Sequence, residues 1–417
     1  MNLKKYLWED DKKYRLFLFL AIAILLGISI FEAIKNNNYF YIGNPVKLNN
    51  DDVRYLHTAR LFLQTGQLYY YGVPTAFIMP LFPLFLSGIM AIFGTGDSGV
   101  TAIRIIQCLM QGVSLYFVYL IARELFNKKV AIIAAFLFAL YLPEAVSPNL
   151  ILTEVLFQFL FIIMLYFSIV AIKENKMIYY IITSIFWALT CLTRPNAAIF
   201  PLFIVIFWIV NKYTIKDMIK YTLVAFVTFT IFFTPWWVRN YNLKGHFILF
   251  TDSSANPKLL GAFIFDAPPS FAKDIPAEDG YEKFENNKYM SDEEQNNLAN
   301  YIIETGFKTQ PLKYTAWYTL GKTFMLYCIP YYWRPILGIS MGVMTGIHWI
   351  YIFLAILGII FMLLKGNRNR NVGMLLTIFT MCTVVYWPFV TFSRYGFPNM
   401  FMLIIAAAFA IASFIDR

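Results

Sequence analysis

The chain has 417 residues, of which 59% are hydrophobic and 14% are charged. Soluble globular domains carry about a quarter charged residues, so this composition excludes an ordinary soluble protein and indicates a chain that lies mostly in a membrane. The formal net charge of +10 is explained by cytoplasmic loops enriched in Lys and Arg. No basic helix with interleaved aromatic residues lies outside a membrane flank, which argues against a nucleic-acid partner.

The cysteines and histidines are too scattered in the sequence to indicate a metal site or a disulfide framework. The four cysteines lie in separate apolar segments, where they are expected to be small buried hydrophobic side chains. The sequence also lacks a phosphate-binding P-loop, a dinucleotide-binding glycine fingerprint and a serine nucleophile elbow. Chemistry driven by a cytoplasmic nucleotide is therefore not expected.

The N-terminus is basic and precedes an apolar run from Leu16 to Phe31. Glu32 and Lys35 come directly after this run, and no small-residue cleavage site follows it. This pattern is typical of a retained signal anchor rather than a cleaved signal peptide. We therefore expect the first span to remain in the protein, with its N-terminus in the cytoplasm.

Apolar segments predict about ten membrane-spanning helices, because a helix needs about 20 apolar residues to cross a bilayer. The predicted spans are residues 16–34, 102–122, 130–146, 151–172, 177–193, 196–210, 219–238, 344–364, 372–392 and 396–415. Two further apolar stretches, 80–93 and 316–333, are bounded by prolines, and we expect them to be interfacial helices at the outer surface. Counting both as spans gives the alternative topology of twelve helices.

The basic clusters favour the ten-span topology. With a cytoplasmic N-terminus and ten spans, every compact basic cluster falls on the inner side, as the positive-inside rule requires. These clusters are residues 123–129, 173–176, 212–220 and 365–370. Counting 80–93 alone as a span would move the next three clusters to the outside.

The outer face then holds a first outer loop, 35–101, and a long outer loop, 240–343. Within the long loop, the polar part 240–313 has too few apolar residues to bury much of a core alone. We therefore expect this loop to pack on the membrane domain, and the whole chain, 1–417, to form a single transmembrane domain.

A polar stretch from Asn49 to Arg60 follows the first span and contains two adjacent carboxylates, Asp51 and Asp52. Carboxylates at a bilayer wall are costly unless they are paired, hydrated or used. We interpret Asp51 as a catalytic base and Asp52 and Tyr55 as substrate-binding residues, since Asp51 and Tyr55 share a face if 52–64 is helical. The alternative is a solvated helix N-terminus, for which Asn and Asp are good capping residues.

Glu154 lies about one turn inside a predicted span, near its outer end. A carboxylate at this depth is expensive and usually faces a cavity or a cationic partner. We therefore predict that Glu154 contributes to substrate binding. The structural alternative is a pair with an arginine that locks two helices together, and the two roles can coexist.

Three arginines, Arg194, Arg239 and Arg394, are predicted to lie on the outer face, against the usual charge bias. Each alone fits a side chain that reaches from the bilayer to the interface. Together they indicate an anionic substrate, because a guanidinium binds phosphate through paired donors. Asn240 and Tyr395, which adjoin two of these arginines, are further substrate-binding candidates.

Taken in order, these stretches resemble the GT-C class of polytopic glycosyltransferases, and in particular the bacterial type akin to protein O-mannosyltransferases and lipid A aminoarabinose transferases (glycosyltransferase family 39-like). The resemblance is carried by Asp51-Asp52-x-x-Tyr55, Pro80-Leu81-Phe82-Pro83, Arg104 with Gln107, Thr153-Glu154, Leu192-Thr193-Arg194-Pro195, Pro235-Trp236-Trp237-Val238-Arg239-Asn240 and Arg394-Tyr395. Two features depart from the pattern. The second acid is Asp52, where the family usually has Glu, and Ser253 to Pro257 stand where it often has a Gly-rich turn.

The resemblance implies an all-α polytopic membrane protein with a GT-C-like bundle in the inner or plasma membrane and an extracytoplasmic active site. It implies inverting transfer of a sugar from a polyprenyl-phosphate donor to an acceptor hydroxyl or amine on a lipid, glycan or protein. Asp51 would accept the proton, with its pKa raised by desolvation, and the arginines would stabilise the leaving phosphate. No cofactor is required by this chemistry, although carboxylates beside a phosphate can recruit a divalent metal.

Two other functions fit parts of the sequence. A glycan polymerase or ligase would use a related frame to move a whole lipid-linked glycan. A transporter or lipid flippase would be expected to show internal repeats and charged residues at mid-bilayer. The sequence has no internal repeat and its polar residues gather towards one surface, so the transferase is favoured.

Overall fold

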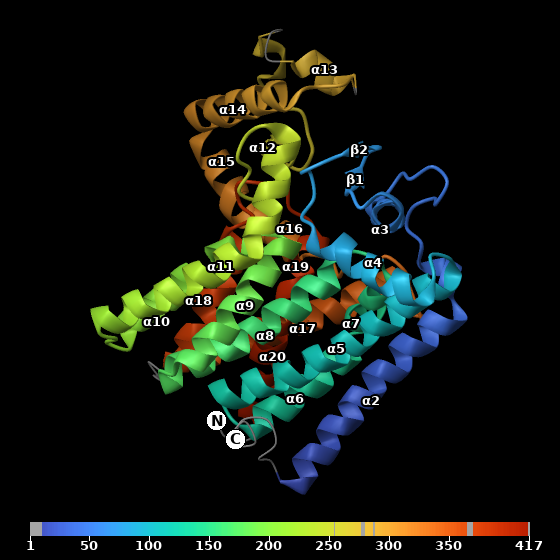
Figure 1. The fold of residues 1–417 in the computed structure, drawn as a ribbon. Helices are drawn as coiled ribbons and strands as arrows, with labels where there is room; N and C mark the ends of the chain where they lie inside the picture. The colour runs from blue at the N-terminus through green and yellow to red at the C-terminus, as the bar shows by residue number, and fades with distance from the viewer. Residues whose placement is uncertain (1–10, 254, 277–279, 287, 365–369, 416–417) are drawn as a thin grey trace.

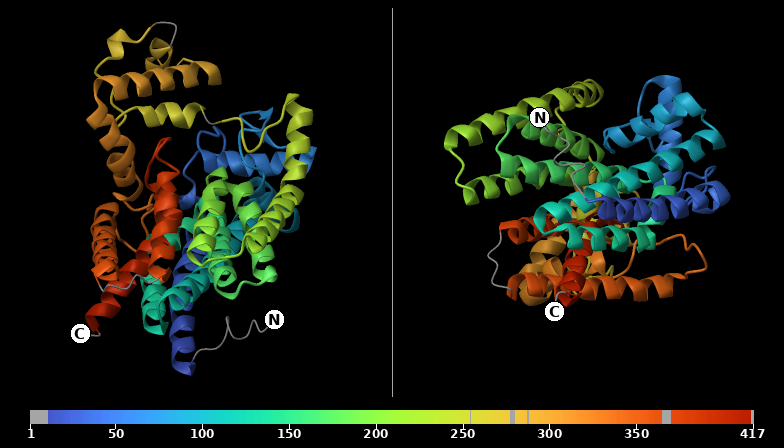
Figure 2. Two further views of the ribbon diagram at one scale, coloured as in Figure 1. Left: turned by 90° about the vertical axis from the view of Figure 1, so that its left-hand side faces the viewer. Right: turned by 90° about the horizontal axis from the view of Figure 1, so that it is seen from below.

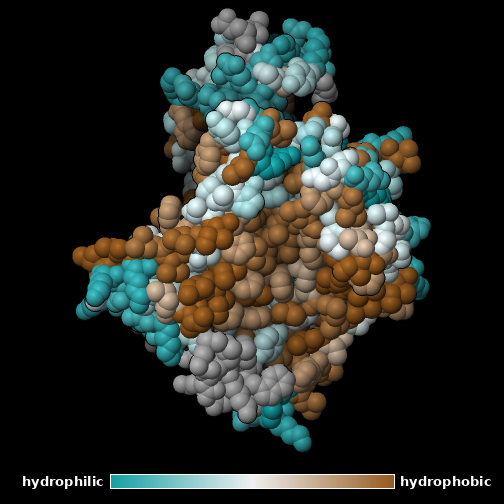
Figure 3. Space-filling model, in the orientation of Figure 1, coloured by the Kyte–Doolittle hydropathy of each residue, from teal (hydrophilic) through white to brown (hydrophobic). Residues whose placement is uncertain are grey.

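The computed structural model describes residues 11–253, 255–276, 280–286, 288–364 and 370–415, which fold into a tilted bundle of helices with a smaller helical cap above it (Figures 1 and 2). Extended pairing within these ranges is confined to one isolated bridge and an antiparallel hairpin of β1 (Tyr69–Tyr70) and β2 (Val73–Pro74). On the face shown in Figure 3, a broad apolar band covers the bundle below the polar cap.

Six helical segments in the described part are long and apolar enough to cross a membrane. They are α2 (Lys12–Lys35), α5 (Asp97–Leu125), α8 (Thr153–Glu174), α11 (Ile215–Lys244), α17 (Met341–Leu364) and the segment Ser393–Ile415, which contains α19 (Ser393–Gly396), η7 (Phe397–Asn399) and α20 (Met400–Ile415). A seventh is obtained if α6 (Lys128–Leu140) is joined to α7 (Leu142–Val146) and η2 (Ser147–Asn149) across a 62° bend.

The remaining apolar helices are shorter than a standard span. They are α4 (Leu81–Phe93), α9 (Met177–Thr193), η3 (Pro195–Ile199) with α10 (Phe200–Val210), and α18 (Arg370–Val384). At 1.5 Å per residue, α4 covers about 20 Å, whereas the hydrocarbon core is about 30 Å thick. The predicted multi-pass helical architecture is confirmed, whereas the number of spans, ten or twelve, stays a prediction.

The connections predicted to be cytoplasmic gather at the end of the bundle opposite the cap (Figure 1). Lys173 Nζ donates to the carbonyl oxygen of Glu124 at 2.5 Å, which joins the α8–α9 connection to the end of α5. At the start of α18, Arg370 donates to the side chain of Asn211, and Asn371 donates to the carbonyl of Leu125 at 3.0 Å. The clusters on which the orientation was predicted are therefore neighbours in space.

The first outer loop is organised by α3 (Asp51–Thr65), which begins where the sequence predicts it. Asn50 caps the helix by accepting a hydrogen bond from the Asp51 amide at 2.7 Å. Gly66 ends it with a φ of 71°, which a glycine adopts without strain. The β1–β2 hairpin then folds back onto α3, where the Thr58 hydroxyl donates to the carbonyl of Tyr69 at 2.6 Å. The loop also contains η1 (Asn37–Phe40).

The long outer loop forms the cap, which has a small core of its own. Its elements are α12 (Ala255–Ala262), η4 (Ala272–Asp274), α13 (Tyr281–Glu285), α14 (Asp292–Thr309), α15 (Pro311–Ala316), the π-helical turn η6 (Trp317–Gly321) and α16 (Lys322–Tyr327). A buried apolar cluster joins α12, α14 and α15 through Leu259, Leu298, Ile302 and Tyr314. This core is small and includes Tyr314, which lies just beyond 240–313, so the single transmembrane domain stays a prediction.

Candidate active site

A cavity of about 810 Å³ lies where the bundle meets the cap. Segments that are far apart in the sequence form its wall. They are α3, residues 77–79 after β2, residues 193–196 at the end of α9, residues 246–253 after α11, and the turn between α18 and α19. The candidate site residues that line it are Asp51, Tyr55, Arg194, Arg394 and Tyr395. The volume is within the range of small-molecule sites.

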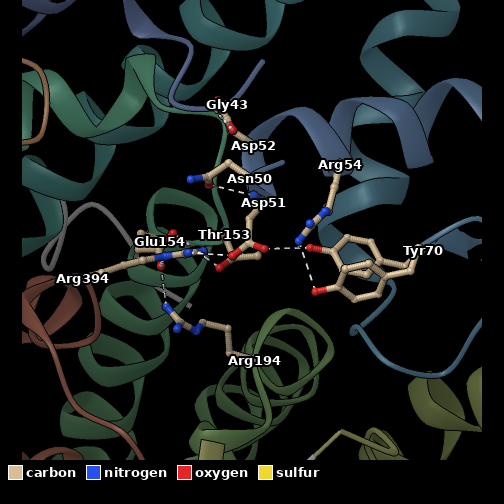
Figure 4. Close-up of polar contacts among 11 residues, drawn as sticks. Gly43, Asn50, Asp51, Asp52, Arg54, Tyr70, Thr153, Glu154, Arg194 and Arg394 are labelled. Atoms are coloured by element: carbon tan, nitrogen blue, oxygen red, sulfur yellow. Dashed lines mark hydrogen bonds and ion pairs between the residues drawn. The ribbon is translucent and has the colours of Figure 1, made fainter. Parts of the chain in front are cut away.

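Asp51 points into this cavity and makes two polar contacts there (Figure 4). Its Oδ2 accepts a hydrogen bond from Arg394 Nη1 at 2.7 Å, and its Oδ1 accepts one from the Tyr70 hydroxyl at 2.8 Å. The carboxylate is 35% exposed, so it is held by protein partners yet remains open to a molecule in the cavity. The placement needed for a base is therefore present.

Glu154 is buried at the start of α8 and bridges two arginines (Figure 4). Its Oε1 accepts from Arg394 Nε at 2.5 Å and from Arg194 Nη1 at 2.9 Å. Together with Asp51, these residues form one continuous chain of ion pairs, Asp51–Arg394–Glu154–Arg194. The predicted cationic partner of Glu154 is confirmed, and there are two of them.

The ion pair changes the acidity of Asp51 in a direction that the sequence did not predict. Burial alone would raise the pKa of this carboxyl, but the charge of Arg394 and the hydrogen bonds from Arg394 and Tyr70 outweigh it. The pKa of Asp51 is therefore lowered from its ordinary value. The expectation of a raised pKa is therefore wrong for Asp51 while it is paired with Arg394, and in this pair Asp51 is a weak base.

Aromatic residues hold the arginines and shape the cavity wall. The guanidinium carbon of Arg194 lies 4.9 Å from the ring centroid of Tyr395, a distance typical of a cation–π contact. Tyr395 in turn stacks between Tyr386, at 5.5 Å, and Phe392, at 4.4 Å. Tyr55, which also lines the cavity, packs edge-on against Phe82 of α4. Tyr55 and Tyr395 thus lie where a bound molecule could touch them.

Asp52 does not join this cluster, although it is adjacent to Asp51 in the sequence. Its carboxylate is buried and accepts hydrogen bonds from the backbone N–H groups of Ile42 at 2.7 Å and Gly43 at 3.1 Å. Successive residues of a helix point about 100° apart, so the two acids face different surroundings. The predicted substrate-binding role of Asp52 is replaced by a structural one, in which it holds the chain ahead of α3.

Arg239 and Asn240 are also absent from the lining of the cavity. Arg239 Nη1 donates to the carbonyl of Thr75 at 2.5 Å and to Asn240 Oδ1 at 2.9 Å, and Nη2 donates to the carbonyl of Leu68 at 3.3 Å. This arginine therefore fixes the two ends of the β-hairpin rather than facing an anion. A direct substrate contact at Arg239 and Asn240 stays a prediction, which these contacts within the protein do not support.

Two contributors to the site were missed by the sequence analysis. Tyr70 lies on the hairpin and donates to Asp51, and burial, with the nearby Tyr55 and Asp51, raises the pKa of its hydroxyl, so it stays protonated. The segment 246–253 lines the cavity and is fastened to the hairpin exit by the bond from the Ser253 hydroxyl to the carbonyl of Phe77 at 2.9 Å. The aromatic run before Gly72 is the sequence signal that could have indicated a turn beside Asp51.

Similarity to known proteins agrees with this architecture. Residues 74–238 match the family model described as dolichyl-phosphate-mannose-protein mannosyltransferase. No curated protein sequence matches the chain. Among solved structures, the chain resembles the Archaeoglobus fulgidus oligosaccharyltransferase in its apo form, with a TM-score of 0.60 and 17% identity over 98% of this chain and 51% of that one.

Two further solved structures are similar. One is the same archaeal enzyme, AglB, in complex with an inhibitory peptide and a dolichol-phosphate (TM-score 0.61, 18% identity, 98% of this chain and 51% of that one). The other is ArnT from Cupriavidus metallidurans bound to undecaprenyl phosphate (TM-score 0.45, 12% identity, 95% and 77%). The chain spans about half the length of the oligosaccharyltransferase.

The fold is that of the GT-C membrane glycosyltransferases. The resemblance to this superfamily, predicted from the ordered motifs, is confirmed, and the family-model match supports an enzyme of the glycosyltransferase class.

Proposed function

We propose that the protein is an inverting glycosyltransferase that moves a sugar from a polyprenyl-phosphate donor to an acceptor hydroxyl or amine. The observation that carries the proposal is that one cavity joins Asp51 to two arginines, Arg194 and Arg394. A base and a pair of phosphate-binding arginines within one cavity are what such a transfer needs. The matching family model is named for a dolichyl-phosphate sugar donor, which supports the donor class.

In the proposed reaction, the acceptor hydroxyl gives its proton to Asp51 while its oxygen attacks the anomeric carbon. The bond from that carbon to the phosphate oxygen breaks, and its electron pair leaves with the polyprenyl phosphate. Attack opposite the leaving group inverts the anomeric centre. Arg194 and Arg394 stabilise the negative charge that develops on the phosphate, so no general acid is required at the leaving group.

Because Arg394 is paired with Asp51, donor binding also changes the pKa of Asp51. Arg394 uses Nη1 for Asp51 and Nε for Glu154, so a donor phosphate that binds at Nη1 competes with Asp51 for this guanidinium. When the phosphate takes the place of Asp51, the carboxylate loses its strongest stabilising charge and gains an anionic neighbour. Both changes raise its pKa. Asp51 thus becomes an effective base only when the donor is bound.

This coupling predicts that the pH profiles of kcat and of kcat/KM for the donor fall at different pH values on their acid sides. A lowered pKa keeps Asp51 ionised in the free enzyme as pH falls below the ordinary value of 3.8. The limb of kcat/KM for the donor reports that free enzyme, whereas the limb of kcat reports the complex. We expect the kcat limb about one pH unit or more above the kcat/KM limb. Coincident limbs, measured where the protein stays folded, would contradict the coupling.

We further propose that the site faces the extracytoplasmic side of the inner or plasma membrane and that the helices cross it ten times. The basic clusters of the inner connections lie together at the end opposite the cavity, and the positive-inside rule places that end in the cytoplasm. The three shorter segments α9, η3–α10 and α18 complete the ten crossings.

We propose that no metal is required for the transfer. No group of three or more His, Cys, Asp or Glu suited to a metal ion occurs among the residues that the structure describes. The arginines can carry the phosphate charge that a divalent cation would otherwise neutralise. A related archaeal oligosaccharyltransferase has been solved in complex with Zn and sulfate, so activity should be compared with and without added divalent ions and chelator.

The proposal is tested by incubating the purified, reconstituted protein with polyprenyl phosphates that carry single labelled sugars and with candidate lipid, glycan and protein acceptors. We expect one sugar to be added to an acceptor, as measured by product mass, and polyprenyl phosphate to be released in equal amount. Transfer of an oligosaccharide would favour a polymerase or ligase. Lipid movement across the vesicle without any product would favour a flippase.

A further inference from the structure

Lys322, at the start of α16, is a completely buried lysine that the site described above does not use. Its Nζ donates to the backbone carbonyls of Trp387 at 2.6 Å and Phe389 at 2.9 Å. Its ammonium lies 3.9 Å from the ring centroid of Tyr318. No carboxylate within ion-pair distance of Lys322 is found in the described ranges.

A buried ammonium without a counter-ion is costly, and apolar replacements are usually better for stability. Burial lowers the pKa of Lys322 to about 7, so near neutral pH the amine is partly charged and donates in either form. A residue that costs stability and makes specific contacts is a candidate for function. The two carbonyls that Lys322 binds therefore indicate what its role is.

Both carbonyls belong to the turn 385–392, which connects α18 to α19. This turn supplies Tyr386, Phe389 and Val390 to the wall of the cavity, and Arg394 is the second residue after it. Thr323, the next residue of α16, holds the same turn by accepting from Trp387 Nε1 at 3.0 Å. The position of the phosphate-binding arginine thus depends on the turn that Lys322 holds.

The cap holds the other side of this turn. The carbonyl of Pro257, on α12, accepts from the Val390 amide at 2.8 Å. Gly261 lies so close to the turn that a Cβ there would be 2.4 Å from the carbonyl carbon of Phe389. Only glycine fits this approach without displacing the backbone. The turn therefore contacts α12 on one side and α16 on the other.

The helix that presents Lys322 is irregular immediately before it. Residues Trp317–Gly321 form a π-helical turn, a feature that is rare and frequently found at functional sites. Within it, Trp317 Nε1 donates to the carbonyl of Gly261 at 3.1 Å. The irregular turn ties α16 to α12 and directs Tyr318 over the Lys322 amine.

We propose that Lys322 is a positioning residue that fixes the turn 385–392 and, through it, the approach of Arg394 to the donor phosphate. This role rests on the proposed transfer from a polyprenyl-phosphate donor. Lys322 touches neither the donor nor Asp51; it acts through the two carbonyls that it binds.

The test compares Lys322→Met, which keeps the length but has no donor, with Lys322→Gln, which keeps a donor. Lys313→Met serves as the control, because Lys313 is an exposed lysine on the preceding helix α15. Two readouts are measured on the full chain: hydrogen exchange of the peptide that covers 385–392, and the separate values of KM for the donor and kcat. Binding of polyprenyl phosphate is measured alongside.

We expect Lys322→Met to speed exchange in the turn, to raise the donor KM and the Kd for polyprenyl phosphate about tenfold, and to change kcat less. Lys322→Gln should recover part of both effects, and Lys313→Met should show neither. Unchanged exchange in the turn, or a loosened turn with an unchanged donor KM and Kd, would overturn the proposal. Hydrogen exchange does not depend on turnover. If the wild-type protein transfers no sugar, the proposed function is rejected, but the exchange data still show whether Lys322 holds the turn 385–392.

Discussion

Asp51→Asn is expected to abolish sugar transfer and, at the same time, to bind polyprenyl phosphate more tightly than the wild type. Loss of a general base costs about 10²- to 10⁴-fold in rate. The same substitution removes the carboxylate that occupies Arg394 Nη1 at 2.7 Å, so the lipid phosphate no longer competes for that donor. A gain in affinity of about tenfold corresponds to about 1.4 kcal/mol. Turnover and equilibrium binding are measured on the same purified variant.

Tyr70→Phe is the matched control for this experiment. It removes a neutral hydrogen bond to Asp51 Oδ1 but leaves the charge that competes with phosphate. We expect its lipid affinity to stay close to that of the wild type. Near-normal transfer by Asp51→Asn would contradict the role of Asp51 as base. Weaker lipid binding by that variant, with an unchanged melting temperature, would contradict the competition for Arg394.

Arg394→Met is expected to lose both donor binding and part of the protein's stability. This side chain connects the two carboxylates, and Glu154 is only 1% exposed. Without Arg394, Glu154 keeps Arg194 as its charged partner, and removing one member of a buried ion-pair network costs about 3–5 kcal/mol. Arg394→Lys should restore little of the function, since one ammonium cannot present the same fork of donors to both groups. Lipid binding and thermal unfolding are the two measurements.

Arg239→Met provides the comparison for Arg394→Met. Arg239 was also a phosphate-binding candidate in the sequence, but it donates to the carbonyls of Thr75 and Leu68 instead of lining the cavity. Its replacement should loosen the hairpin and change lipid affinity by no more than about threefold, well under the 1.4 kcal/mol of a tenfold change. Equal losses of lipid binding at positions 239 and 394 would contradict the assignment of the phosphate site to Arg394.

Much of the membrane architecture could be predicted from the sequence because hydropathy reports directly on the cost of burying polar groups in lipid. The helix that begins at Asp51 was also predictable, since its capping residues are local in the sequence. The pairing of Glu154 with arginine followed from the cost of an unpaired carboxylate in a span. Each of these predictions depends on interactions within a few residues or on the bilayer itself.

The remaining features depend on which segments meet in space. Arg394 and Asp51 are separated by 343 positions, and nothing in the sequence selects that contact over one with Arg239. Asp51 and Asp52 look equivalent until the helix turns one towards the cavity and the other towards the Ile42 amide. The small core of the cap draws its apolar residues from separate helices, α12, α14 and α15, and the sequence does not show that these helices meet.

The alternating chain Asp51–Arg394–Glu154–Arg194 has consequences for which anions enter the cavity. The charges of two acids and two guanidinium groups cancel, so this chain of ion pairs exerts little long-range attraction on dissolved sulfate or inorganic phosphate. An anion that takes the N–H donors now used by Asp51 or Glu154 must separate an internal pair, and a small solute gains nothing else by doing so. A ligand anchored by a long hydrocarbon tail brings a separate source of binding free energy from the bilayer. The site can therefore discriminate between lipid-borne and water-borne phosphates without a steric filter.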